Sequence, residues 1–518
     1  MNSNRRCVNR NKWSFASLSF IWLSLMILLC YPWQMLWAQD GTDTLADKEI
    51  TKAVGIEMIV DPIVAGLNVN IRTTDGVVTL DGTVDNLAIK ERSERIALSV
   101  LGVRSVINKL ELRDVSKSDT RIADDIKWKL INNPATDSYE VEVKVLGGVA
   151  VLSGRVDSLA EQRLAEKMAK QVSGVKRVDN LIVAAIPSTR NDVEIAADIK
   201  ESLYWDRRVD SHLIEVVVKD GEVMLLGSVG SGIEKKQAIQ TSWVGGVRDV
   251  DASALKVNPY LSRDELRSDK YVTKSDDSIK KAVEQALKYD ARVLDDRIKV
   301  EVESGVVSLR GSVENLQARQ YAVQDAQNTV GVMQVKNFLT LYETAKVPDK
   351  TLENHVFRAI SIDPYVDNFE ILASSKDGTI TLLGTVDSFF EKAHAESIVS
   401  GITGVKEVNN KLNVLKETLL VYQPYIDDWD INSFIWYSRV NPSTDQSDRK
   451  IAENIREQLW WSPFVDADHI KVHVTNGIAT LTGTVENWTE WSIANENAYE
   501  GGAITVINKL NVVDQPNV

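Results

Sequence analysis

Side chains that could carry out chemistry are sparse in this 518-residue chain, which has five histidines and two cysteines. His469 and His473 are four residues apart, but they lie in an alternating segment that predicts a β-strand. Four residues of strand span about 13 Å, too far for both rings to bind one metal ion. His355 and His394 lie in predicted helices with no second ligand nearby in the sequence. We therefore expect no metal site and no cofactor.

Motifs for phosphate binding and acyl transfer are missing as well. The stretch 227–232 (GSVGSG) has neither the G-x-G-x-x-G spacing nor a following lysine–serine pair. No G-x-S-x-G nucleophile elbow is present. Acidic runs, such as Asp124-Asp125 and Asp427-Asp428, predict solvated acidic faces, with weak divalent-cation binding as the alternative. These observations predict a protein that is not an enzyme.

A ten-residue string recurs six times and organises the chain. It reads DGVVTLDGTV at 75–84 and returns at 147–156, 220–229, 304–313, 377–386 and 476–485. Its first glycine predicts a tight hairpin turn, because glycine tolerates positive φ. A second glycine follows six residues later, and we expect it to permit a β-bulge or close helix packing. The turn glycines are Gly76, Gly148, Gly221, Gly305, Gly378 and Gly477.

Each string lies within a repeat that reads αββαβ. Apolar residues precede the turn glycine in an i, i+4, i+8 stripe, which is Ile50, Val54 and Met58 in the first copy, and such a stripe predicts an amphipathic helix. An alternating strand, the hairpin and its return strand follow. A second helix is predicted to begin at an acidic cap, and a Gly-Val step precedes the last strand. The predicted caps are Asp85, Asp157, Glu314, Asp387 and Glu486, with none in the third copy.

The predicted fold class is α+β: a tandem array of six two-layer αββαβ modules, each with a three-stranded mixed sheet covered by two helices. A polar linker at 259–273 and an acidic, aromatic linker at 418–445 interrupt the array, which suggests two halves of three modules. The predicted bounds are module 1, 46–114; module 2, 118–187; module 3, 191–258; module 4, 274–343; module 5, 348–417; and module 6, 446–514.

The first 38 residues have a different composition from the rest. Four basic residues precede an apolar run that ends near Pro32, and this predicts a secretory signal peptide cut after Ala38. The uncharged stretch Trp13–Ala38 is also long enough to remain as a membrane anchor. Removal of residues 1–38 would remove both cysteines and change the formal charge from −14 to −18.

The repeated pattern resembles the BON domain, the module of osmotically inducible periplasmic proteins of Gram-negative bacteria. The matching elements are the helix stripe, the DGVVTLDGTV-type hairpin, the capped second helix, the Gly-Val step and the VINKLEL-type strand. The resemblance implies a periplasmic location, with an inner-membrane signal anchor facing the periplasm as the alternative. It implies non-catalytic binding of a phospholipid membrane surface or envelope proteins, in osmotic-stress protection or envelope maintenance. It carries over no catalytic residue.

Tryptophan is concentrated near the C-terminal end. We interpret these side chains as a candidate surface for lipid headgroups, glycan or protein. The alternative for the pair on the second helix of module 6 is core packing. The candidates are Trp460, Trp461, Trp488 and Trp491 in module 6, and Trp429 and Trp436 in the preceding linker.

The overall charge constrains the choice of partner. A net-negative chain lacks the basic footprint of a nucleic-acid-binding protein. Anionic lipid repels such a chain on average, so lipid binding needs a local basic patch, avidity between modules or aromatic insertion. Two other functions remain open: a structural adaptor or scaffold that spaces envelope proteins, and a small-ligand or cation sensor.

Overall fold

A computed structural model of the protein describes residues 45–513, except 62, 65–67, 114–116, 134–135, 137–140, 157, 185–189, 294, 343–345, 367–370, 416–446, 487 and 504. The predicted signal peptide and the linker 418–445, with Trp429 and Trp436, therefore lie outside the described residues. Within the described part, no helix combines the length and apolar character needed to cross a bilayer.

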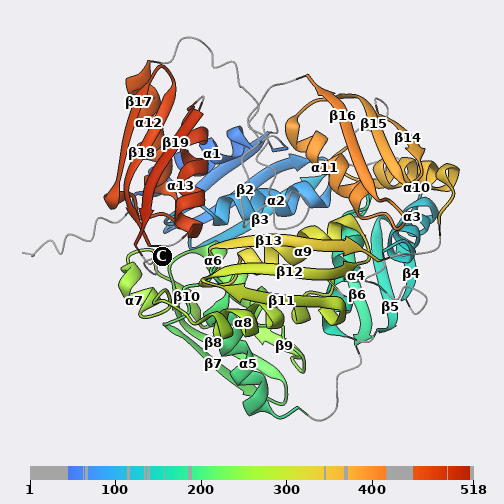
Figure 1. Ribbon diagram of the computed structural model, residues 1–518, viewed down its shortest axis with the longest axis horizontal. Coiled ribbons are helices and arrows are strands. Elements are labelled where there is room, and N and C mark those ends of the chain that lie inside the picture. Colours follow the sequence, from blue (N-terminus) through green and yellow to red (C-terminus); the bar gives the residue numbers. More distant parts are fainter. Residues whose placement is uncertain are drawn as a thin grey trace, which may run out of the picture. The chain divides into compact units, whose positions relative to one another are not determined.

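Each module follows the predicted element order (Figure 1). Module 1 contains α1 (Asp47–Val60), β1 (Val69–Thr74), β2 (Val77–Val84), α2 (Leu87–Leu98) and β3 (Ser105–Leu112). Module 2 contains α3 (Asp119–Ile131), β4 (Val141–Leu146), β5 (Val149–Val156), α4 (Leu159–Lys170) and β6 (Arg177–Ala184). Module 3 contains α5 (Asp192–Trp205), β7 (Ile214–Lys219), β8 (Glu222–Val229), α6 (Gly232–Thr241), β9 (Asp249–Asp251) and β10 (Leu255–Val257).

The second half repeats this order. Module 4 contains α8 (Asp276–Tyr289), η2 (Asp295–Arg297), β11 (Ile298–Glu303), β12 (Val306–Val313), α9 (Leu316–Gln327) and β13 (Gln334–Leu341). Module 5 contains α10 (Asp349–Ile362), β14 (Ile371–Lys376), β15 (Thr379–Val386), α11 (Phe389–Ser400) and β16 (Glu407–Val414). Module 6 contains α12 (Asp448–Trp461), η4 (Ala467–His469), β17 (Ile470–Thr475), β18 (Ile478–Val485), α13 (Trp488–Glu500) and β19 (Thr505–Val512).

The return strand of each hairpin is the middle strand of its sheet. In module 1, β2 pairs antiparallel with β1 and parallel with β3, and the other modules repeat this arrangement. The α+β fold class with three-stranded mixed sheets is therefore confirmed. Module 3 differs because one extra residue divides its last strand: Val250 pairs with Val223, whereas Leu255 pairs with Gly227.

The helix stripes read from the sequence form the cores. Ile50, Val54 and Met58 of α1 are buried against the inward-facing residues Val78 and Leu80 of β2. A comparable cluster of buried apolar side chains is centred on each of the other modules. Removal of this apolar surface from water is the main source of stability of each module.

Both central residues of the hairpin turn have positive φ, as at Asp377 (53°) and Gly378 (87°), which is the conformation of a type I′ turn. An aspartate in the first turn of helix one supports it. Asp349 accepts hydrogen bonds from the backbone N–H groups of Asp377 (3.1 Å) and Gly378 (3.3 Å). The equivalent aspartates make the same pair of bonds: Asp47, Asp119, Asp192, Asp276 and Asp448.

The expectation for the second glycine was wrong. The register around Gly82 is regular, with Gly82 opposite Val69, so the strand has no bulge there. A Cβ atom at Gly82 would instead collide with the carbonyl oxygen of Asn68, just before β1. Glycine is needed because two backbones approach each other closely.

In modules 1, 2, 4 and 5 the predicted acidic caps were displaced by one residue, whereas the residue after Glu486 in module 6 lies outside the described residues. The true N-cap of the second helix is the Asn or Ser that follows the acid, and its side chain accepts a hydrogen bond from the N–H three residues later. The third module is capped in the same way, by Ser231, although no cap was predicted for it. Asp85, Asp157, Glu314 and Asp387 therefore precede the caps Asn86, Ser158, Asn315 and Ser388.

The linker at 259–273 contains a short helix, α7 (Arg263–Arg267), and docks on module 3. The Lys270 ammonium is buried and donates to the carbonyl oxygens of Leu203 (3.2 Å), Asp206 (2.6 Å) and Val209 at the C-terminal end of α5. A cation at this end of a helix is favourable. The sequence indicated only a polar connection here.

Candidate functional site

Modules from the two halves meet in three pairs through one recurring backbone hydrogen bond. The residue before the Gly-Val glycine donates its N–H to the carbonyl oxygen of the last residue of helix one in another module. The first helices of the paired modules also contact each other: α1 with α12, α3 with α10, and α5 with α8. The bonds are Leu101 to Trp461 (modules 1 and 6, 3.1 Å), Ser173 to Ile362 (modules 2 and 5, 3.0 Å) and Val330 to Trp205 (modules 4 and 3, 2.9 Å).

An open groove of about 600 Å³ lies where α3 crosses α10. Two apolar side chains are exposed along it, Phe357 with 62% and Ile131 with 54% of the surface accessible. We call this feature the α3/α10 groove. It is lined by Arg121, Asp124, Lys127, Trp128, Ile131, Phe357, Arg358 and Ser361.

Beneath the groove, one buried carboxylate holds three cations. The side chain of Asp125 is 1% exposed, and its oxygens lie 3.0 Å from Lys117 Nζ, 3.4 Å from Arg121 Nε and 3.6 Å from Arg358 Nη2. The exposed Lys127 adds a positive charge and the exposed Asp124 a negative one. The cluster therefore has a local excess of positive charge in a chain whose formal charge is −14.

The cations are held in place by further contacts. Arg358 donates to the carbonyl oxygen of Asp124 (3.2 Å) and lies over the ring of Trp128, 5.1 Å from its centroid. His355 packs edge-on against the same ring. Burial and the nearby Arg358 guanidinium lower the pKa of His355, so this imidazole is neutral at pH 7.

This geometry suits an anionic amphiphile. Guanidinium groups bind phosphate oxygens in a planar, two-pronged geometry, and exposed Phe and Ile side chains gain free energy when they enter an apolar phase. Both kinds of group lie within one groove.

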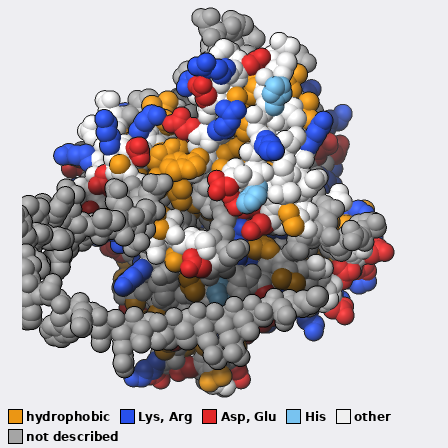
Figure 2. All heavy atoms as spheres, turned by 90° about the vertical axis from the view of Figure 1, so that its left-hand side faces the viewer, with side chains coloured by type: hydrophobic (Ala, Val, Ile, Leu, Met, Phe, Trp, Pro, Cys, Tyr) orange, Lys and Arg blue, Asp and Glu red, His pale blue; other side chains and the backbone are white. Residues whose placement is uncertain are grey.

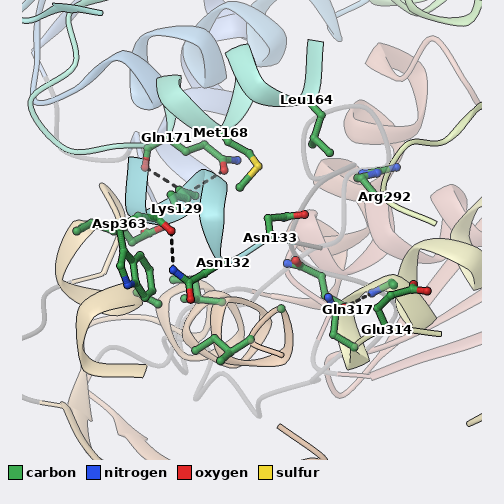
Figure 3. Close-up of a pocket in the computed structure, with 18 of the residues that line it drawn as sticks. Lys129, Asn132, Asn133, Leu164, Met168, Gln171, Arg292, Glu314, Gln317 and Asp363 are labelled. Carbon is green, nitrogen blue, oxygen red and sulfur yellow. Dashed lines mark hydrogen bonds between the residues drawn. The ribbon is translucent and has the colours of Figure 1, made fainter. Parts of the chain in front are cut away.

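A smaller cavity of about 110 Å³ lies between modules 2, 4 and 5, and Trp128 lines both it and the groove (Figure 3). Several of its polar lining groups make hydrogen bonds. Lys129 Nζ donates to Gln171 Oε1 (3.1 Å), and Gln317 of module 4 donates to Ser397 of module 5 (3.1 Å). The space is large enough for several water molecules, and the Gln317–Ser397 bond joins modules 4 and 5.

Of the tryptophans predicted to form a surface in module 6, one is exposed and two pack against hydrophobic cores. Trp460 is 47% exposed and packs edge-on against Trp461, with 4.8 Å between ring centroids. Trp461 packs against the core of module 1, and Trp491 packs against the core of its own module. Trp488 begins α13, but its side chain is outside the described residues. An interaction role stays a prediction, and among these four it rests on Trp460 and Trp488.

Figure 2 shows the side of the molecule on which module 6 lies in Figure 1. A hydrophobic patch there is surrounded by charged side chains of both signs. Within the described part of the chain, no three His, Cys, Asp or Glu side chains come together in a way that suits a metal ion.

The groove residues were not singled out in the sequence, because α3 and α10 belong to modules that are distant along the chain. A signal was present in the repeats themselves. Arg121 and Phe357 occupy helix-one positions at which modules 3 and 4 have Glu194 and Glu284. An alignment of the six modules would have drawn attention to both.

Comparison with known proteins agrees with this architecture. Six stretches match the family model described as BON domain: 46–114, 118–185, 191–259, 275–342, 348–416 and 447–514. The chain belongs to the BON domain family.

Curated relatives match part of this BON-domain chain. Osmotically-inducible protein Y of Escherichia coli is 36% identical over 141 residues, which are 26% of this chain and 70% of the relative. Outer membrane lipoprotein DolP of Haemophilus influenzae is 30% identical over 173 residues, or 32% of this chain and 87% of the relative. A solved structure of CdsD, a structural protein of the type III secretion system of Chlamydia trachomatis, matches 39% of this chain and 90% of its own length at 16% identity, with a TM-score of 0.11.

Proposed function

We propose that this protein is a non-catalytic component of the bacterial envelope that binds anionic phospholipid surfaces through the α3/α10 groove. Its role is osmotic-stress protection or envelope maintenance. The names of two relatives, an osmotically inducible protein and an outer membrane lipoprotein, support this setting. The predicted signal peptide is consistent with export to the periplasm.

The single observation that carries the proposal is the cluster around Asp125, which has three cations on one buried carboxylate beneath exposed Phe357 and Ile131. The chain as a whole is net negative, so anionic lipid repels it at long range. A local basic cluster overcomes that repulsion within a Debye length of the surface, about 8 Å at physiological salt. Phe357 and Ile131 then add apolar burial at the interface.

A protein partner is the second candidate, in line with a scaffold role. The strand β6 lies at the edge of the module 2 sheet, where it pairs with β5. It exposes Leu181 and Val183. An exposed apolar edge strand is a surface on which a partner strand can add.

The test is flotation of the exported chain with phosphatidylcholine vesicles that contain or lack phosphatidylglycerol. We expect binding only to the anionic vesicles, weakening as salt is raised. The variant Arg121→Glu/Arg358→Gln should bind at least tenfold more weakly. The matched control Arg72→Glu/Arg449→Gln makes the same change in net charge at two exposed arginines outside the groove, on β1 and α12. It should bind like the wild type. Equal loss in both variants would reject the groove as the site.

A further inference from the structure

The second helices of modules 1, 2 and 3 contact each other in cyclic order. Lys170 of α4 pairs with Glu91 of α2 (3.1 Å), and Lys236 of α6 pairs with Glu94 of α2 (3.1 Å). Arg163 of α4 lies over the ring of Trp243, just beyond α6, 4.6 Å from its centroid. Glu91, Arg163 and Lys236 all lie fifteen residues after their turn glycine. The same helix position therefore faces the next module in each contact.

A cavity of about 860 Å³ lies where these helices meet α8 and α9 of module 4. We call it the ring cavity. Its lining includes eight Lys and Arg residues but six Asp and Glu residues, an excess of positive charge in a net-negative chain. Its volume lies within the range of roughly 300–1,000 Å³ that is typical of small-molecule sites.

Two of the lining arginines, Arg95 and Arg163, form no ion pair within the described part of the chain. Arg95 of α2 has a buried Nε with no hydrogen-bond partner there. Arg163 makes the contact with Trp243, and its electrostatic partner Glu166 instead binds Lys170 (3.0 Å). Burial lowers the pKa of Arg163 to about 10, because the attraction of Glu166 offsets its desolvation only in part.

Two of the lining acids, Asp290 and Asp325, are neighbours. Burial and the neighbouring Asp290 carboxylate raise the pKa of Asp325 well above its usual range, which favours its neutral form. Asp290 itself is paired with Arg292. The raised pKa of Asp325 and the ion pair of Asp290 both reduce the negative charge that these two acids present to the ring cavity.

We propose that the ring cavity binds a small, multiply charged anion of the phosphate class, with Arg95 and Arg163 as its guanidinium ligands. Guanidinium groups without carboxylate partners lose less on binding an anion than paired ones, since no ion pair must be broken. This site is distinct from the α3/α10 groove, so the inference does not depend on the proposed function.

The experiment uses the exported chain with inorganic pyrophosphate as the probe. We expect saturable binding by calorimetry and a melting temperature that rises with pyrophosphate concentration. The variant Arg95→Gln/Arg163→Gln should weaken pyrophosphate binding at least tenfold. It should lower the melting temperature of the free protein only slightly, because neither arginine makes an ion pair and only the contact between Arg163 and Trp243 is lost. If that variant does not fold, Arg95→Lys/Arg163→Lys keeps the charge but loses the planar fork, and it should bind more weakly than the wild type.

A second set of measurements distinguishes binding of a soluble anion from binding of a lipid headgroup. Arg95→Gln/Arg163→Gln should float with phosphatidylglycerol vesicles like the wild type, and the groove variant Arg121→Glu/Arg358→Gln should keep its pyrophosphate affinity. No saturable pyrophosphate binding by the wild type, or unchanged affinity in the foldable arginine variant, would overturn the proposal. Loss of flotation in the ring-cavity variant would overturn the assignment to a soluble anion.

Discussion

The crossing of α3 with α10 and the crossing of α5 with α8 share one scaffold but differ in charge. Asp125 and Asp198 each lie twenty-three residues before their turn glycine. Asp125 is surrounded by three cations. Asp198 instead pairs with Arg190 and accepts a hydrogen bond from the Tyr289 hydroxyl (2.7 Å). One cluster has an excess of positive charge, and the other is neutral.

The difference arises from three substitutions between equivalent positions of the repeat. Where the first crossing has Arg121, Phe357 and Arg358, the second has Glu194, Glu284 and Gln285. A backbone hydrogen bond of the same kind joins the modules in both pairs, although module 2 donates to module 5 and module 4 donates to module 3. The repeat therefore supplies the geometry, and a few surface side chains make one crossing suitable for an anionic partner.

The largest expected effect follows from removal of the central carboxylates. Asp125→Ala leaves three cations without their common partner, of which Lys117 is largely buried, and should cost about 2–4 kcal/mol. Asp198→Ala leaves one arginine and one hydroxyl without their carboxylate partner, and should lower the free energy of unfolding by about 1–2 kcal/mol. Urea unfolding of both variants checks the order. A larger loss for Asp198→Ala would contradict the difference between the crossings.

Next in size is the contribution of the exposed aromatic ring. Phe357→Glu installs the residue of module 4 and should weaken binding to phosphatidylglycerol vesicles about tenfold, or ~1.4 kcal/mol. Its fold should persist, since the ring is exposed. Phe338→Glu, at an exposed phenylalanine on β13, is the matched control. If both variants bind like the wild type in a flotation titration, Phe357 has no role at the interface.

A smaller gain is expected when the second crossing is made to resemble the first. Glu194→Arg/Gln285→Arg adds the two missing guanidinium groups. Because Glu284 remains in place of phenylalanine, we expect only about a threefold gain in vesicle affinity, or ~0.7 kcal/mol. The gain should disappear at high salt. A salt-resistant gain would mean that something other than charge had changed.

The smallest effect concerns pH. Burial and Arg358 lower the pKa of His355 in the folded protein, so the unfolded chain binds this proton more tightly. The stability that this group contributes is present above the unfolded pKa of about 6.5 and is lost as pH falls below it. His355→Ala, which installs the residue of module 4 at this position (Ala282), should remove this part of the pH dependence. Melting curves recorded between pH 5 and 8 give the change in the free energy of unfolding over this range. That change should differ between the variant and the wild type by less than about 1 kcal/mol.

The fold was predictable because its signals are local and repeated. The stripe Ile50, Val54 and Met58 and the Asp-Gly turn depend on spacing within one module, and every copy repeats them. The capping residue was missed by one position, because an acid and an Asn or Ser are adjacent there and both favour helix starts.

The candidate site was not predictable in the same way. Arg121 and Arg358 converge on Asp125 only through the pairing of modules 2 and 5, and that pairing leaves no periodic pattern. Trp461 and Trp491 were weighed as surface residues on composition, but packing between and within modules accounts for them. Composition identifies unusual side chains, whereas their role depends on which module they face.

The most direct test places a polarity-sensitive fluorophore in the groove. Residues 39–518 contain no cysteine, so in a protein of these residues Phe357→Cys and Phe338→Cys each provide one labelling site. We expect a blue shift for the probe at 357 on phosphatidylglycerol vesicles, no shift on phosphatidylcholine vesicles, and no shift at 338 on either. No shift at 357 under conditions in which the protein floats, or an equal shift at 338, would contradict the claim that the α3/α10 groove meets the membrane.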